Sequence, residues 1–470
     1  MKRYYRTFIF LLVIILMHFY GCMQPQNNNT NDDEGDMLIT LIDENFDGVV
    51  TPANFGFDKG SSVIDNALVI TRNMQNYAAS VKIFNPEVMG QYFIDLSFDW
   101  KTNFTVTGIS AGIEFRDLYG RLIFALASGS NNDLWYSTTG QDSNSNQCAD
   151  EQYPEWTKIK IDINKTYTVH LQINFKDSTV SYFISEKGNS KNIVAVENAN
   201  TSAANLAKMI ACNYYTSGAA GGIIIDNFLL KGANDIPTGI LKGKTMYAFG
   251  DSIVAGHLYT QGSFPNFVAL CEGMKLNKYS ANGATIMSAV IWTQVYSAPS
   301  AAPDFIVFNG GTNDASTSTV INGTKIGSVS VDFENFDKTT FAGSFENTLL
   351  QMKTKWPNAK IVYVAVHKLC SRDWNTQEAM HKLTKSICEK WDVVMADVYC
   401  DTILDTRDND HRIRYTFDNL GDDGLPGHPG TINSSAASPS GTHPNLWAIE
   451  KFYTPVVSAA LQKAAQGSQQ

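Results

Sequence analysis

The N-terminal half of the chain, from about residue 38 to 232, alternates apolar and polar residues with a period of two. The stretches 94–101 and 169–176 alternate without interruption, and isoleucine occupies every second position of 159–163. This period is typical of β-strands that bury one face and expose the other to solvent. Because such strands recur at short spacing with turn residues between them, the pattern predicts a β-sandwich or jelly roll over residues 37–235.

The C-terminal half follows a different pattern, after a short linker at 232–239 that contains Gly, Asn and Pro. Near-continuous apolar runs predict buried strands at 244–250, 276–281, 304–310, 359–366 and 392–399. Helices are expected between them, for example over Phe264–Glu272 and Phe341–Lys355. Strands that alternate with helices form parallel sheets covered on both faces. We therefore expect an α/β domain at residues 240–466.

The first residues have the features of a targeting segment rather than of a folded domain. A basic start at 1–6 precedes an apolar core at 8–19 that is short for a membrane span. The following Gly21-Cys22 resembles a bacterial lipobox, which predicts a signal peptide at 1–21 and a lipidated, flexible polar tether at 22–36. An ordinary signal peptide with a chance cysteine is the alternative. The protein is thus expected to be an exported bacterial lipoprotein, in the outer membrane or periplasm or at the cell surface. Its only expected contact with a membrane is the lipid on Cys22.

Composition and charge narrow the classes of partner. The 470 residues are 44% hydrophobic and 17% charged, which is ordinary for a globular protein, and the formal net charge is −10. Without a dense Lys/Arg cluster, a nucleic-acid partner is not expected. The seven cysteines include no CxxC pair and no sequence-local His/Cys group, so the spacing predicts no metal site.

Candidate chemistry begins where the first predicted strand of the second half ends. Gly250-Asp251-Ser252 follows that strand, and parallel sheets carry their ligands at this end. Gly283, Asn313 within Gly311–Asp314, and His443-Pro444 follow in that order. Over residues 243–465 these blocks resemble the SGNH (GDSL-type) hydrolase family. The resemblance implies a flavodoxin-like three-layer fold, Ser252 as nucleophile, Gly283 and Asn313 as oxyanion donors, His443 as base, and no cofactor.

One position departs from the family pattern. The family's acid lies three residues before the histidine, where this chain has Ser440. A serine hydroxyl cannot offset the charge of an imidazolium, so either a dyad operates or another carboxylate substitutes. Asp422 and Asp423 are the nearest candidates. A rival histidine, His428, is followed by loop composition. An apolar helical pattern, expected to form one helix kinked at Pro455, follows His443 and favours it.

Two insertions, at 315–340 and 400–440, flank the proposed catalytic residues and are expected to shape the substrate cleft. The stretch 223–230 is loosely similar to the last strand of carbohydrate-binding jelly rolls. If the β-domain binds carbohydrate, Trp135 and Tyr136 are candidates for a platform that stacks on sugar rings. The alternative is that both are packing residues. Together these features predict an exported serine esterase that removes ester groups, foremost O-acetyl groups, from carbohydrates. A general short-chain carboxylesterase or lipase is the alternative. A second alternative is a catalytically weak surface lipoprotein that binds glycans, because Ser440 stands where the family has its acid.

Overall fold

The computed structural model describes most of the two predicted domains. The described residues are 38–47, 61–71, 79–84, 86–102, 109–118, 120–129, 132–138, 140–142, 152–213, 222–234, 239–258, 262–288, 290–316, 325–418 and 439–467. The predicted signal peptide, Cys22 and the tether lie outside them, as do Asp422, Asp423 and His428. No helix within the described part of the chain is long and apolar enough to cross a membrane.

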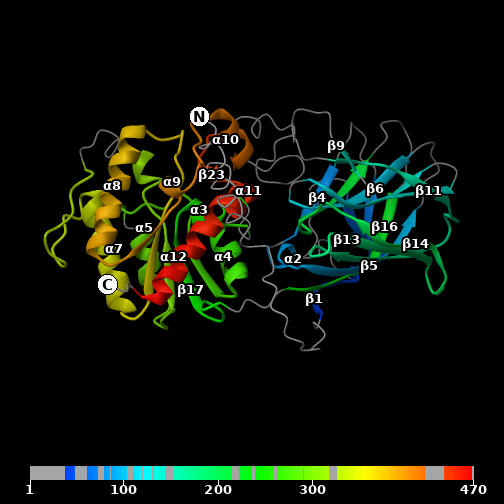
Figure 1. Cartoon of the computed structure of the whole chain (residues 1–470), viewed down its shortest axis with the longest axis horizontal. Coiled ribbons are helices and arrows are strands. Elements are labelled where there is room, and N and C mark those ends of the chain that lie inside the picture. The colour runs from blue at the N-terminus through cyan, green and yellow to red at the C-terminus, as the bar shows by residue number, and fades with distance from the viewer. Residues whose placement is uncertain are drawn as a thin grey trace, which may run out of the picture. The chain divides into compact units, whose positions relative to one another are not determined.

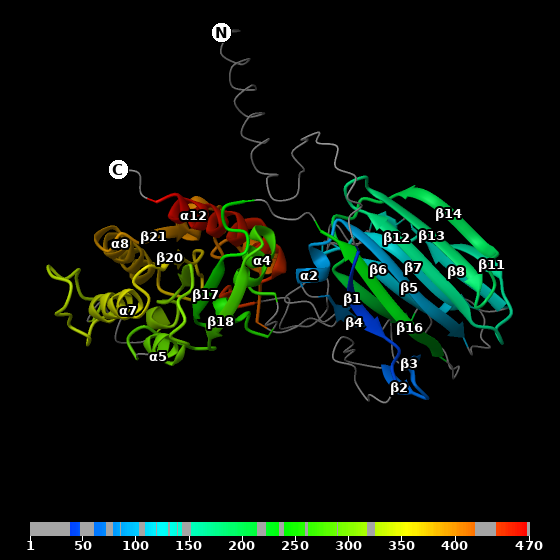
Figure 2. The same ribbon diagram turned by 90° about the horizontal axis from the view of Figure 1, so that it is seen from below.

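The first part is a sandwich of two antiparallel sheets (Figures 1 and 2). One sheet has the order β14-β13-β12-β5-β16-β3-β2, with β1 paired to β16. Its strands are β1 (Ile39–Glu44), β2 (Ser61–Ile64), β3 (Ala67–Thr71), β5 (Phe93–Thr102), β12 (Tyr167–Asn174), β13 (Thr179–Glu186), β14 (Asn192–Asn200) and β16 (Gly222–Ala233). The other has the order β11-β8-β7-β6-β15-β4. Its strands are β4 (Ala79–Ile83), β6 (Ile109–Arg116), β7 (Leu122–Gly129), β8 (Asp133–Ser137), β11 (Thr157–Lys160) and β15 (Lys208–Asn213). A short helix α2 (Pro86–Met89) and a two-stranded ribbon of β9 (Gly140–Asp142) and β10 (Gln152–Pro154) complete this part.

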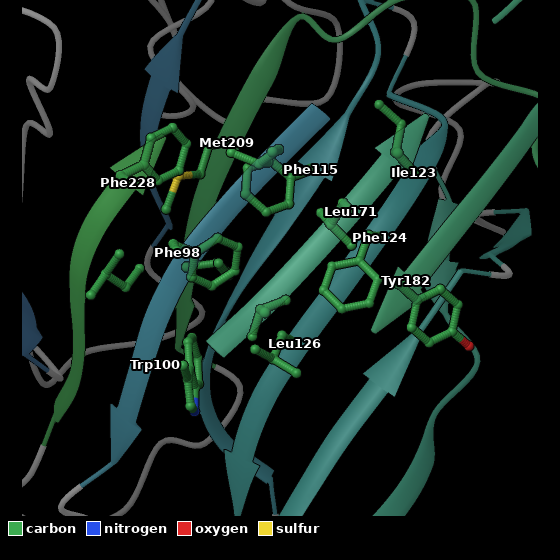
Figure 3. Packing of buried hydrophobic residues seen from close by; sticks show 14 of the residues in the cluster. Phe98, Trp100, Phe115, Ile123, Phe124, Leu126, Leu171, Tyr182, Met209 and Phe228 are labelled. Atoms are coloured by element: carbon green, nitrogen blue, oxygen red, sulfur yellow. The ribbon is translucent and has the colours of Figure 1, made fainter. Parts of the chain in front are cut away.

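The period of two in the sequence corresponds to burial in this sandwich. Alternate residues of β12 are buried along its whole length. Figure 3 shows the inner faces meeting: Phe98 of one sheet lies 6.0 Å from Phe115 of the other, measured between ring centroids, and Phe124 lies 5.2 Å from Tyr182. Aromatic pairs at these separations add to the stability that burial provides. The predicted β-sandwich is therefore confirmed.

The aromatic pair that the sequence offered as a sugar platform takes part in packing. Tyr136 packs against the sandwich core, with its ring centroid 5.9 Å from that of Tyr182. The half-buried Trp135 carries the ammonium group of Lys158 over its ring, 4.7 Å from the centroid. These contacts favour the packing interpretation of both residues.

The second part is a parallel sheet with the order β18-β17-β19-β20-β21. Its strands are β17 (Thr245–Gly250), β18 (Lys275–Ser280), β19 (Phe305–Phe308), β20 (Lys360–Ala365) and β21 (Val394–Asp397). The helices are α3 (Ser252–Ala255), α4 (Phe264–Glu272), α5 (Val290–Ser297), α7 (Phe341–Lys355), α8 (Trp374–Lys390), α9 (Val398–Asp401), α10 (Asn409–Tyr415), α11 (Leu446–Ala448) and α12 (Thr454–Gln466). The shorter elements are the 3-10 turn η2 (Asp314–Ser316), the strands β22 (Thr416–Phe417) and β23 (His443–Pro444), and the π-helical turn η3 (Ile449–Tyr453).

Helices cover both faces of this sheet, as predicted (Figure 2). Met246 and Ala248 of β17 are buried in a cluster that includes residues of α4 and α12. Tyr247 and Phe249, which point the other way, are buried with residues of α5, α7 and α8. Consecutive side chains of a strand point to opposite faces, so a strand that is apolar throughout needs cover on both sides. The result is the expected three-layer α/β architecture.

The C-terminal helix differs in detail from its prediction. We expected one helix kinked near Pro455, but α11 and α12 are separated by the π-helical turn η3. Proline has no N–H to donate and cannot sit inside a regular helix without loss of a hydrogen bond. Here Pro455 opens α12, and the Thr454 hydroxyl donates to the carbonyl of Ile449 at 2.9 Å. The backbone is thus adjusted before the proline rather than at it.

Candidate active site

The candidate nucleophile stands at the junction of β17 and α3. Gly250 ends the strand with φ of 153°, and a Cβ there would lie 2.1 Å from Asn309 Oδ1. Asp251 is the N-cap of α3, and its carboxylate accepts a hydrogen bond from the amide of Ile253 at 2.9 Å. Ser252 is the first helical residue and is 5% exposed. Glycine and an aspartate cap therefore turn the chain sharply and fix Ser252 at the carboxyl edge of the sheet.

The aspartate of this loop is itself held by the neighbouring strand. Asn309, directly after β19, donates from its side-chain amide to the Asp251 carboxylate at 3.1 Å and accepts from the Asp251 backbone N–H at 3.3 Å. Burial raises the pKa of Asp251 above its usual value. This carboxyl group is enclosed and engaged in capping, so its place is structural support for the serine loop rather than proton transfer.

The structure brings Ser252 and His443 together. The Nε2 atom of His443 lies 2.9 Å from the Ser252 hydroxyl oxygen. His443 belongs to β23, which pairs with β22 so that His443 lies opposite Phe417. The following Asn445 caps α11 through a hydrogen bond from the amide of Ala448. The pairing of β22 with β23 and the cap of α11 therefore fix the backbone on both sides of His443, and this holds its ring beside Ser252.

A carboxylate that the sequence analysis did not name faces the other side of the imidazole. Asp418, directly after β22, places Oδ1 3.6 Å from His443 Nδ1, an ion-pair separation that is longer than a formed hydrogen bond. Ser440 donates its hydroxyl to the same carboxylate at 2.8 Å. Burial alone would raise the pKa of Asp418, but the interactions with His443 and Ser440 outweigh it and hold the pKa below its usual value. Ser440 thus supports an acid that comes from elsewhere in the chain.

The position of Asp418 carried a weak signal in the sequence. Tyr415-Thr416-Phe417 is a short run of strand-forming residues directly before it, and 419–438 separate it from the histidine segment. The nearer Asp422 and Asp423 drew attention instead, and they lie outside the described residues. Asp418 approaches His443 because β22 pairs with β23, a pairing that the sequence alone does not indicate.

A second histidine lies flat against His443. The ring of His257 is stacked on it, with centroids 3.9 Å apart and ring planes 4° apart. His257 Nε2 donates to the backbone carbonyl of Asp418 at 2.9 Å. Burial, and then the charge of His443, lower the pKa of His257. His257 therefore contacts both the imidazole and the residue that bears the acid, a role that the sequence analysis missed.

The two proposed oxyanion donors lie in loops that follow β18 and β19. Gly283 is exposed, with φ of 76°, a left-handed conformation that glycine adopts without strain. Asn313 donates from its side-chain amide to the carbonyl of Ala284 at 2.9 Å, which joins the two loops. Asp314 strengthens this connection, because its carboxylate accepts from the backbone amides of Ile286 and Met287, each at 2.9 Å.

The serine loop is tied to the same assembly. Ala281 donates its backbone N–H to the carbonyl of Gly250 at 3.1 Å. Gln294 of α5 both donates to the Gly250 carbonyl and accepts from the Gly250 N–H, each at 2.9 Å. The loops that carry Ser252, Gly283 and Asn313 are therefore held to one another by hydrogen bonds at one edge of the sheet. A preorganised set of donors is what stabilisation of a developing oxyanion requires.

The chemistry available at this edge is that of a hydroxyl, an imidazole and a carboxylate in sequence. Such an arrangement can remove the serine proton as the oxygen attacks a carbonyl carbon. Among the described residues, one group of side chains could hold a metal ion, namely His381, Asp397 and Cys400. None of these three belongs to the candidate active site around Ser252.

The three-layer fold brings these residues to the carboxyl edge of its parallel sheet. Residues 248–446 match the GDSL-like lipase/acylhydrolase family, and the chain carries a domain of that family. An antiparallel β-domain precedes this GDSL-like lipase/acylhydrolase domain.

Several solved structures are similar to the chain. A possible lipase from Chitinophaga pinensis is 18% identical, with 47% of this chain and 96% of that chain covered and a TM-score of 0.34. A member of the lipolytic protein G-D-S-L family from Veillonella parvula is 14% identical, with 45% and 95% covered and a TM-score of 0.31. A family two carbohydrate esterase from Cellvibrio japonicus is 13% identical, with 90% and 99% covered and a TM-score of 0.30. No curated protein matches the chain.

Proposed function

We propose that the protein is an exported serine esterase that removes ester-linked acyl groups, foremost O-acetyl groups, from carbohydrates. The observation that carries the proposal is the 2.9 Å contact between the Ser252 hydroxyl and His443 Nε2, with Asp418 on the Nδ1 side of the ring. The order serine, imidazole, carboxylate is the arrangement that activates a serine for attack on a carbonyl.

The proposed reaction proceeds through an acyl-enzyme. His443 Nε2 takes the proton of Ser252 as Oγ bonds to the ester carbonyl carbon, and then delivers that proton to the leaving alcohol. Asp418 stabilises the imidazolium and keeps the remaining ring proton on Nδ1. Water, deprotonated by the same imidazole, then releases the acid and restores Ser252.

The oxyanion of each tetrahedral intermediate needs donors that are already in place. We assign this role to the backbone amides of Ser252 and Gly283 and to the Asn313 side chain. The Asn313 amide nitrogen carries two hydrogens, and the bond to Ala284 uses one of them and orients the group. The second is left for the substrate oxygen. Loss of one such donor typically costs about 2.7–4 kcal/mol of transition-state stabilisation.

The acid that the sequence analysis missed bears on the competing function. A glycan-binding protein with little catalysis was considered because Ser440 stands where the family has its acid. With Asp418 facing His443 and Ser440 bonded to Asp418, that argument loses its basis. The geometry therefore favours turnover over binding alone.

The choice of substrate rests on the burial of Ser252, the attached β-sandwich and the predicted export. Ser252 is nearly buried, which favours a short acyl group such as acetyl over a bulky one. The attached β-sandwich could hold a polymeric substrate close to the site and so raise its effective concentration. Export as a lipoprotein on Cys22 would bring the enzyme to extracellular or periplasmic glycans. A general short-chain esterase is the alternative that the experiment below separates.

The test is release of acid from p-nitrophenyl acetate, p-nitrophenyl butyrate, acetylated xylan and acetylated pectin. We expect Ser252→Ala and His443→Ala to lower kcat by at least about 10³-fold, because serine and base act as one unit. The exposed Ser386→Ala and the half-buried His411→Ala serve as matched controls and should retain wild-type rates.

The polymer assays then separate the substrate classes. A kcat/KM on an acetylated polymer that exceeds the value on p-nitrophenyl acetate supports the carbohydrate proposal. Turnover confined to small esters would replace it with a general short-chain esterase. Binding of the polymers without turnover, unchanged in Ser252→Ala, would establish the glycan-binding alternative.

A further inference from the structure

We propose that His381, Asp397 and Cys400 form a binding site for one divalent transition-metal ion of the zinc class. The three residues come from different elements that meet at β21, the edge strand of the parallel sheet. His381 lies on α8, Asp397 is the last residue of β21, and Cys400 lies on α9. Their ligand atoms all lie within 4.8 Å of one another. Imidazole, carboxylate and thiolate are the three ligand types that zinc prefers.

The distances fit a tetrahedral ion with a small adjustment. Zinc bonds of roughly 2.0–2.3 Å to nitrogen, oxygen and sulfur imply ligand separations of about 3.4–3.6 Å. The observed separation between Cys400 Sγ and His381 Nε2 is 3.8 Å. His381 Nε2 lies 2.9 and 3.0 Å from the two Asp397 oxygens, so this pair would open by about 0.4–0.5 Å to admit the ion. One carboxylate oxygen also accepts the Cys400 backbone N–H at 3.0 Å, which leaves the other as the ligand.

The arrangement differs from that of a cysteine-based catalytic triad. In a triad the acid and the nucleophile occupy opposite nitrogens of the ring. Here the carboxylate and the thiol both approach the same atom, His381 Nε2, as they would around a shared ion. Convergence of a carboxylate and a thiol on one ring nitrogen points to coordination rather than to thiol catalysis.

The surroundings orient the ligands. The His381 ring is stacked on that of Tyr399, with centroids 4.4 Å apart and planes 20° apart. His381 and Tyr399 also line a cavity of about 60 Å³. The cavity wall includes Gly311 and Thr312, directly before the proposed oxyanion residue Asn313.

The charges around the ligands nearly balance. Asp397 interacts electrostatically with Lys385, and Cys400 with Lys368. Asp401 adds a carboxylate whose pKa burial and the charge of Asp397 raise. Two carboxylates therefore face two ammonium groups before the ion arrives, and the ion itself stabilises the thiolate that forms as it binds.

Binding must displace protons. The thiol proton of Cys400 leaves to solvent as sulfur bonds to the ion, because a coordinating thiol is deprotonated by the metal. The hydrogen that joins His381 Nε2 to Asp397 also leaves this atom, and a neutral ring takes up one proton from solvent on Nδ1, so this exchange releases no net proton. Because the thiol does release a proton, the affinity is expected to rise with pH. No oxidation or reduction takes part.

The test is titration of the chelator-treated, full-chain protein with Co²⁺, followed by competition with Zn²⁺. We expect one equivalent of Co²⁺ to produce a thiolate-to-cobalt charge-transfer band together with visible bands of tetrahedral intensity, both removed by Zn²⁺. Cys400→Ser should abolish the charge-transfer band. His381→Gln should weaken binding by at least about tenfold, since even the loss of a group that only orients a ligand costs that much.

Two controls keep the result interpretable. The exposed Cys271→Ser on α4 should leave the band unchanged. Circular dichroism and esterase activity establish that each variant is folded, and Cys400 is exposed, so its replacement by serine should be tolerated. Absence of a charge-transfer band in the folded wild type would overturn the proposal. So would a band that survives Cys400→Ser or disappears in Cys271→Ser. The outcome is independent of whether Ser252 is the nucleophile.

Discussion

Replacement of Asp418 by asparagine tests the least expected part of the site. The substitution keeps the shape of the side chain and removes its charge, while the Ser440 hydroxyl can still donate to the remaining oxygen. The side chain is 32% exposed and its oxygen lies 3.6 Å from His443 Nδ1. Two unit charges 3.6 Å apart interact by about 4.6 kcal/mol at an effective dielectric constant near 20.

Solvent access to Asp418 reduces that figure, and we expect a loss of roughly 3–4 kcal/mol of transition-state stabilisation, or about 10²–10³-fold in kcat. KM should change little, because the imidazolium forms only as the reaction proceeds. The assay is steady-state hydrolysis of p-nitrophenyl acetate. The matched control is Asp410→Asn, an exposed acid on α10 that should leave kcat unchanged. A kcat for Asp418→Asn within about threefold of wild type would refute the reasoning and indicate that Ser252 and His443 act as a dyad.

Three further variants test other parts of the account. His257→Phe keeps an aromatic ring against His443 but loses the hydrogen bond to Asp418. It should lower kcat about fivefold, which is the effect of one neutral hydrogen bond. A kcat equal to that of wild type would exclude a positioning role for His257. Asn313→Ala should lower kcat on p-nitrophenyl acetate about 10²–10³-fold with little change in KM, and a pure KM effect would contradict its place at the oxyanion. Burial lowers the pKa of His367 to about 4, so the unfolded chain binds more protons than the folded protein between that value and the ordinary histidine pKa. The free energy of unfolding, measured by urea denaturation, should therefore fall as the pH drops from 7 to about 4.5. The fall should be about 2–3 kcal/mol larger in wild type than in His367→Gln. Equal pH dependence in the two proteins would show that His367 is not its source.

The fold was largely predictable because burial imposes a readable period on the sequence. The helix expected over Phe264–Glu272 has those bounds, as does the one over Phe341–Lys355. The strand predicted at 359–366 is Lys360–Ala365. These elements are long or continuously apolar, so tertiary packing and local pattern agree. The π-helical turn before Pro455 was not predicted, because the proline marks a break in the helix but not how the backbone absorbs it.

The site was less predictable, because several of its contacts join residues far apart in the chain. Ser252 and His443 stood in short motifs that could be read locally. Asp418 reaches the imidazole only through the pairing of two-residue strands across a long insertion, a contact with almost no local signature. His257 lies just after α3 and adopts a left-handed backbone conformation with φ of 51°. This conformation is uncommon for a histidine, so the sequence did not predict that its ring would face His443.

The proposed metal ligands illustrate the same limit. The spacing of His381, Asp397 and Cys400 matches no short metal-binding motif, so the sequence predicted no metal site. They meet because α8 leads into β21 and β21 into α9, which returns the chain to the same edge. Convergence of this kind follows from topology rather than from spacing.

The most direct test of the central claim is to locate the covalent adduct formed by an ester-mimicking organophosphate, diethyl p-nitrophenyl phosphate. Intact mass and peptide mapping should show one diethylphosphoryl group on Ser252, formed as p-nitrophenolate leaves, together with loss of esterase activity. The adduct should be absent from Ser252→Ala and should form much more slowly in His443→Ala. An adduct on another residue, with esterase turnover preserved in Ser252→Ala, would contradict the assignment of Ser252 as the nucleophile.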